Sequence, residues 1–75
     1  MPEQQHPPLV PLLVNGDPRS VPPDCTVAEL IDALGFQTRR IAIAVNRELV
    51  PRSTFSTHRL AEDDRVEILE AVGGG

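Results

Sequence analysis

The chain has 75 residues, enough for one small domain with a thin core and too few for a deep active-site cleft. Its net charge of −4, without a single lysine, disfavours binding to nucleic acid or to an anionic membrane surface. A lone cysteine and the lack of a signal peptide or a membrane-length apolar run favour a cytoplasmic protein.

We expect one folded domain, over residues 9–72, between two tails. Residues 1–8 are rich in proline, glutamate and glutamine, have little apolar surface to bury and are predicted to form a disordered tail. Residues 73–75 are three glycines that no packing interaction holds, so we expect a flexible C-terminal tail.

The domain is predicted to begin with a β-hairpin. Residues 12–14 are apolar and form the first strand, whose start we expect Pro11 to delay. Residues 15–18 (Asn-Gly-Asp-Pro) have strong turn chemistry. Residues 19–21 are then predicted to return as a second strand beside the first.

A helix is predicted to start at a capping box. The Thr26 hydroxyl is placed to accept from the Glu29 amide, and the Glu29 carboxylate to accept from the Thr26 amide. Gly35 suits the left-handed position just after the helix, and Phe36 would complete a Schellman ending. One apolar stripe with helical spacing runs between these caps, formed by Val27, Leu30, Ile31 and Leu34.

The second half of the chain is predicted to add further strands. Residues 41–45 alternate β-branched residues with alanines, a period of two that is typical of a strand covered by the helix. After a turn at 46–47, residues 48–50 form a short edge strand and residues 52–64 a polar loop. Residues 65–70 form the last strand. The order β-β-α-β-β predicts an α+β fold of the ubiquitin-like β-grasp type, a mixed sheet curled around one main helix.

Strand alternation predicts which side chains face away from the helix. The apolar set expected to face the helix is Leu12, Val14, Ile41, Ile43, Val45, Val66 and Ile68. The intervening residues then face outward and are predicted to dock partner proteins: Leu13, Ala42, Ala44, Glu67 and Leu69. Isolated exposed leucines without a partner are the alternative, since such leucines are common.

The sequence resembles the ThiS-type sulfur carriers of thiamin biosynthesis over most of its length. The similarity lies in segments 14–16 (Val-Asn-Gly), 26–30 (Thr-Val-Ala-Glu-Leu), 44–52 (Ala-Val-Asn-Arg-Glu-Leu-Val-Pro-Arg), 64–68 (Asp-Arg-Val-Glu-Ile) and the terminal glycines. One departure is Asp63-Asp64, where such proteins commonly have Gly-Asp before the last strand. Aspartate tolerates a left-handed backbone better than most residues, so we expect the turn to survive.

The resemblance implies that the chain is a sulfur carrier and a substrate of enzymes rather than an enzyme itself. An adenylating enzyme of the ubiquitin-activating (ThiF) type would transfer AMP from ATP to the Gly75 carboxylate. Sulfur from a persulfide, supplied by a cysteine desulfurase or a similar donor, would then give a thiocarboxylate for a thiazole synthase of the ThiG type. Gly73 and Gly74 would thread the partner's active site. The partner uses ATP and magnesium, and no cofactor is expected on this chain.

Two neighbouring functions and one of another class stay open. The small subunit of molybdopterin synthase shares this fold and tail, although it usually ends in a glycine pair after a proline-containing stretch. A modifier joined to lysines of other proteins would use the same tail chemistry. A third alternative is a β-grasp interaction module whose C-terminus is inert.

The remaining candidate residues favour plain structural roles. Cys25 precedes the helix, where the helix dipole can lower a thiol's pKa, but it also suits a hydrophobic staple against Leu30. His6 and His58 lie far apart in sequence without a further ligand at metal-binding spacing, so no metal site is expected. No nucleophile–base pair or phosphate-binding loop is present, which argues against catalysis by this chain.

Overall fold

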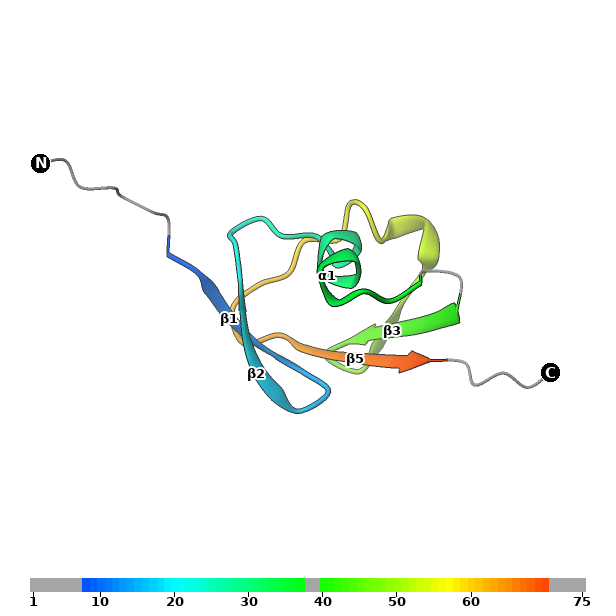
Figure 1. The fold of residues 1–75 in the computed structure, drawn as a ribbon, viewed down its shortest axis with the longest axis horizontal. Coiled ribbons are helices and arrows are strands. Elements are labelled where there is room, and N and C mark those ends of the chain that lie inside the picture. Colours follow the sequence, from blue (N-terminus) through cyan, green and yellow to red (C-terminus); the bar gives the residue numbers. More distant parts are fainter. Residues whose placement is uncertain (1–7, 38–39, 71–75) are drawn as a thin grey trace, which may run out of the picture.

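The computed structural model describes residues 8–37 and 40–70, which form one five-stranded sheet with one α-helix against it (Figure 1). The elements are β1 (Val10–Val14), β2 (Asp17–Val21), α1 (Val27–Leu34), β3 (Ile41–Val45), β4 (Glu48–Val50), a 3₁₀ turn (Arg52–Thr54) and β5 (Arg65–Glu70). The strand order is β2-β1-β5-β3-β4, with β1 and β5 parallel and the other pairs antiparallel. The α+β, β-grasp prediction is confirmed, and the short strand β4 makes the fifth strand.

Two strand boundaries differ from the prediction, because prolines lie inside both strands of the first hairpin. Pro11 is the second residue of β1, and its carbonyl accepts from the Asp63 amide at 2.8 Å. Its missing N–H would point to that same side, away from β2, so the β1–β2 ladder loses no bond. Pro18 lies on the edge strand β2 opposite Leu13. The turn is therefore only Asn15-Gly16, with φ of 51° and 86°.

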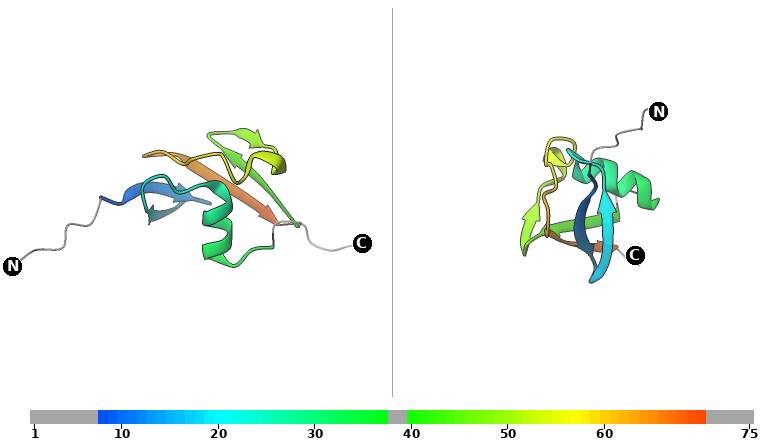
Figure 2. Two further views of the ribbon diagram at one scale, coloured as in Figure 1. Left: turned by 90° about the horizontal axis from the view of Figure 1, so that it is seen from above. Right: turned by 90° about the vertical axis from the view of Figure 1, so that its left-hand side faces the viewer.

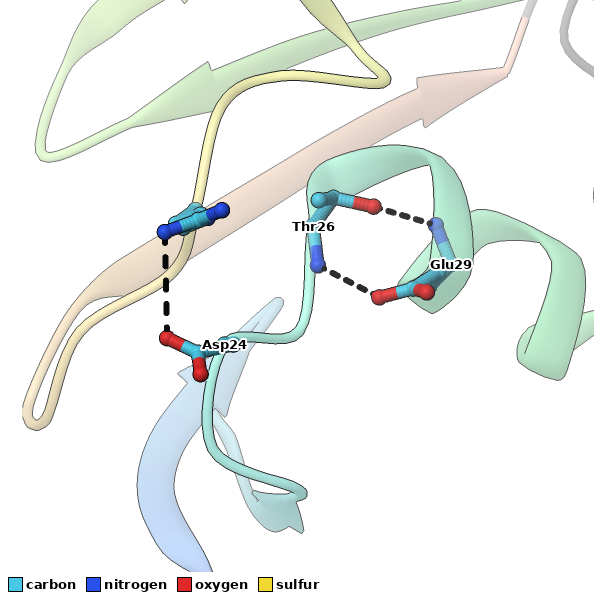
Figure 3. A network of polar contacts seen from close by, with 4 residues as sticks. Asp24, Thr26 and Glu29 are labelled. Atoms are coloured by element: carbon cyan, nitrogen blue, oxygen red, sulfur yellow. Dashed lines mark hydrogen bonds and ion pairs between the residues drawn. The ribbon is translucent and has the colours of Figure 1, made fainter.

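Helix α1 has both predicted caps. Thr26 Oγ1 accepts from the Glu29 amide at 3.2 Å, and Glu29 Oε1 accepts from the Thr26 amide at 2.9 Å (Figure 3). At the other end, Gly35 adopts φ 83° and donates to Asp32 O. The Phe36 amide donates to Ile31 O at 3.2 Å, which completes the Schellman motif.

The loop after β4 also satisfies the start of the helix. The amide of Val27 donates to His58 O and that of Ala28 donates to Phe55 O, both at 2.9 Å. With the capping box, the first four amides at this helix start all have partners, so none is free to bind an anion. The nearby Arg59–Asp24 ion pair is 4.0 Å long and largely exposed, so it contributes little.

The core lies between α1 and one face of the sheet. Figure 2 shows from two further sides that α1 packs on one side of the sheet and leaves the opposite side without a helix. All seven residues predicted to face the helix are buried. The buried core consists of Leu12, Val14, Val21, Cys25, Val27, Leu30, Ile31, Ile41, Ile43, Val45, Val50, Phe55, Leu60, Val66 and Ile68. In the described part of the chain, no helix is long and apolar enough to cross a bilayer.

Candidate docking surface

The sheet face opposite α1 carries the residues predicted to dock partners. Ala42, Glu67 and Leu69 are exposed, and Leu13 and Ala44 are half-buried. Leu69 has 68% of its surface exposed, a large value for a leucine within a strand. The predicted inward and outward orientations of these strand residues are therefore correct. We call the surface formed by these five residues, together with the exposed Leu49 described below, the docking face. Its binding role stays a prediction.

Strand pairing determines which of these residues are neighbours. Ala42 lies opposite Leu69, and Ala44 lies opposite Glu67, on the antiparallel strands β3 and β5. Leu13 on β1 pairs with Arg65 at the start of β5 and not with Leu69. Strand pairing alone therefore does not bring Leu13 and Leu69 into contact. The two leucines nevertheless line the same surface hollow, which has a volume of about 470 Å³. The structure thus brings the two predicted leucines to one depression.

Leu49 is a docking-face residue that the sequence reasoning missed. It lies on β4 opposite Ala44 and is 72% exposed, more than Leu69. The signal was present, since Val50 faces the core and strand alternation then turns Leu49 outward. The apolar part of the docking face therefore extends to the β4 edge of the sheet.

The end of β5 is held to the first hairpin by a side-chain amide. Asn15 Oδ1 accepts from the Ile68 amide at 2.8 Å, and Asn15 Nδ2 donates to Ile68 O at 3.3 Å. Asn15 thereby continues the parallel β1–β5 ladder by two more bonds after β1 itself has ended at Val14. This arrangement fixes β5 close to its last residue, Glu70, which directly precedes the C-terminal segment.

The predicted working residues Gly73, Gly74 and Gly75 lie outside the described residues, as do residues 1–7 and 71–72. The described part of the predicted site therefore consists of the docking face, and the described chain ends with β5. Within residues 8–37 and 40–70, no cluster of three or more histidine, cysteine or acidic side chains has metal-binding geometry.

Cys25 is a core residue in this structure. Its side chain is buried, 7% exposed, and belongs to the same apolar cluster as Leu30. Burial, with a smaller contribution from the negative charge of Glu29, raises the pKa of the Cys25 thiol above its ordinary value of 9.0. The lowering of the thiol pKa by the helix dipole, considered from the sequence, is therefore outweighed by burial. A reactive Cys25 thiolate is disfavoured.

Comparison with known proteins places this geometry in a family. The ThiS family model matches residues 12–75. A crystal structure of a thiamine biosynthesis protein (ThiS) from Geobacter metallireducens superposes with a TM-score of 0.76 at 33% identity, covering 88% of this chain and all of that one. The sulfur carrier protein ThiS of Escherichia coli is 30% identical over 50 residues, 67% of this chain and 76% of that protein.

A thiazole synthase from Paramagnetospirillum magneticum is 34% identical over 64 residues, which are 85% of this chain and only 20% of that enzyme. This chain thus spans about a fifth of the length of the thiazole synthases that it matches. The family model and the Geobacter structure, by contrast, cover most of the chain. The chain therefore belongs to the ThiS family, in which the Escherichia coli relative is a sulfur carrier protein and the Geobacter relative is a thiamine biosynthesis protein.

Proposed function

We propose that the docking face holds the carrier on an ATP-dependent adenylating enzyme while the Gly75 carboxylate enters that enzyme's active site. The observation that carries this proposal is the position of Leu69, exposed on the strand that leads into the C-terminus. Five residues follow Glu70. Fully extended, such a segment reaches at most about 18 Å, so a partner on this face lies within reach of the carboxylate.

Activation is needed because a carboxylate is a poor acyl electrophile, with a delocalised charge and oxygens that leave badly. Attack of the Gly75 carboxylate on the α-phosphate of ATP forms an acyl-adenylate and releases pyrophosphate. The terminal sulfur of a persulfide then attacks the acyl carbon and AMP leaves. Cleavage of the remaining S–S bond by a thiol reductant yields the thiocarboxylate.

The terminal glycines suit this chemistry for a steric reason. A segment that enters a narrow channel in extended form meets its walls with every Cβ atom, and Gly73, Gly74 and Gly75 have none. The same residues carry no side chain that could compete with the carboxylate for the α-phosphate.

We assign sulfur delivery to a thiazole synthase. The assignment is supported by the thiazole synthases that contain a segment similar to this chain, since a carrier and its acceptor enzyme joined in one polypeptide are expected to act on each other. The sulfur donor is assigned by chemistry to the cysteine desulfurase class, which generates persulfides.

Deletion of Gly74 and Gly75 tests the carrier mechanism. We expect the truncated protein to keep its far-UV circular dichroism spectrum and to lose ATP–pyrophosphate exchange with the adenylating enzyme. For the full chain, intact mass spectrometry after addition of ATP and a persulfide donor should show one oxygen replaced by sulfur. Undiminished exchange by the truncated protein would refute the mechanism.

Leu69→Asp tests the docking face. We expect affinity for the adenylating enzyme to fall by about 1–3 kcal/mol, as for an interface hot spot, with little change in melting temperature because Leu69 lies outside the core. Leu9→Asp is the matched control, since Leu9 is 60% exposed and neither belongs to the six residues of the docking face nor lines its hollow. Titration calorimetry gives the affinities, and equal affinity of the two variants would remove the face from the mechanism.

A further inference from the structure

Two arginines stand at the hollow of the docking face, and neither has an ion-pair partner in the described part of the chain. Arg47 and Arg65 both line the hollow together with Leu13 and Leu69. Among residues 8–37 and 40–70, neither guanidinium lies within ion-pair distance of a carboxylate, although Glu67 lines the same hollow. The chain as a whole has a net charge of −4, so the two arginines give the surroundings of Leu13 and Leu69 a local charge opposite to that of the chain.

The acidic residue next to Arg65 in sequence is already engaged elsewhere. Asp64 Oδ1 accepts from Asn46 Nδ2 at 2.9 Å, and Asp64 Oδ2 accepts from the Ala61 amide at 2.8 Å. Both oxygens therefore stabilise turns of the chain rather than neutralise Arg65. Arg65 is therefore left without an ion pair among the described residues.

Arg47 also occupies a backbone position that favours glycine. Asn46 and Arg47 form the two-residue turn between β3 and β4, with φ of 54° and 71°. Such a turn needs positive φ at both residues, and its usual second residue is glycine because a Cβ atom is strained there. An arginine at this place is unfavourable for the turn itself, which indicates that its side chain has another use.

We infer that the hollow receives an apolar side chain of the adenylating enzyme and that Arg47 and Arg65 pair with a carboxylate beside it. The inference rests on the proposed docking and adds the chemistry of the partner surface. The leucines bind the apolar anchor, while the arginines attract an acidic group beside it, although the net charge of the chain repels acidic surfaces. The charge pair thereby sets the orientation in which the C-terminal segment meets the enzyme.

Arg47→Gly separates a binding role of Arg47 from a structural role. If Arg47 serves binding, the variant should lose affinity without losing stability, whereas a structural role predicts a loss of stability. Relief of the positive-φ strain should leave the melting temperature unchanged or raise it by about 4 °C. Affinity for the adenylating enzyme should fall about three- to fivefold. Arg65→Gln should weaken binding similarly, and the double variant about tenfold. Its affinity should also depend less steeply on sodium chloride concentration.

Arg59→Gln is the matched control, since it removes one exposed positive charge near the start of α1, away from the docking face. We expect it to bind like the parent. If both Arg47→Gly and Arg65→Gln bind like the parent while Leu69→Asp binds weakly, the arginine assignment is wrong and the proposed docking stands. If Leu69→Asp also binds like the parent, the docking itself fails.

Another occupant of the hollow would be a second copy of this chain. Sedimentation velocity at micromolar concentration distinguishes the two. We expect a monomer for the parent and for Arg47→Gly, and a parent dimer that dissociates in Arg47→Gly would overturn the assignment to the enzyme.

Discussion

Removal of the Asn15 side chain is expected to loosen the end of β5 and lower the stability of the whole domain. Asn15 donates one hydrogen bond to the backbone of Ile68 and accepts one, at 3.3 and 2.8 Å. The chain turns into β2 after Asn15, so no other backbone group replaces the lost partners on that side of Ile68. Asn15→Gly isolates the effect, because glycine adopts the native φ of 51° without strain.

The magnitude follows from the two bonds. Each contributes about 1 kcal/mol net, and the partly buried groups of Ile68 are only partly rehydrated in the variant, so the free energy of unfolding should fall by about 2 kcal/mol. For a domain of this size, the melting temperature should fall by roughly 10 °C. Asn15→Ala should fall further, by about 1 kcal/mol, because alanine is strained at positive φ.

Urea unfolding gives the free energies, and hydrogen exchange of the Ile68 amide reports the local effect. That amide should exchange faster in Asn15→Gly relative to the core amides of β3. Parental stability together with unchanged exchange at Ile68 would refute the assigned role of the Asn15 amide.

Two further predictions concern Cys25 and Gly35. Because burial raises the pKa of the Cys25 thiol, the folded state keeps its proton above the ordinary value of 9.0, where the unfolded state loses it. The stability linked to this thiol is thus fully present below pH 9.0 and is lost as the pH rises above it. At alkaline pH, the melting temperature of the parent should therefore fall more steeply than that of Cys25→Ser. The same variant should still form the Gly75 thiocarboxylate, as intact mass would show. Gly35→Ala should reduce stability by about 1–2 kcal/mol in urea unfolding, since φ is 83° and a Cβ atom would meet no neighbour within 4 Å, which leaves backbone strain as the cause. A loss of similar size in Gly35→Asn, whose side chain tolerates this conformation better, would contradict that cause.

Short-range chemistry determined much of this structure from the sequence alone. The capping box needs only Thr26 and Glu29, and the Schellman ending only Gly35 with Phe36, because each motif involves residues at most five positions apart. The bounds of β3 and β5 and the inward and outward faces followed from the period-two pattern. The positions of Leu13 and Leu69 on the sheet face opposite α1 were predicted in this way.

Tertiary contacts decided the rest, because they join residues that no local pattern relates. Pro11 is part of β1 because the Asp63 amide, in the loop before β5, donates to its carbonyl. Asp63 lies far from Pro11 in the sequence, so no local pattern around Pro11 predicts this bond. The Asn15–Ile68 bonds span 53 residues. The hollow likewise exists only because a parallel β1–β5 pairing and the β3–β4 turn bring Arg47 and Arg65 to the same leucines. The order of the strands in the sheet depends on how the whole sheet buries its apolar face against one helix. No single segment of the sequence therefore determines that order, whereas each segment indicates the position of its own strand.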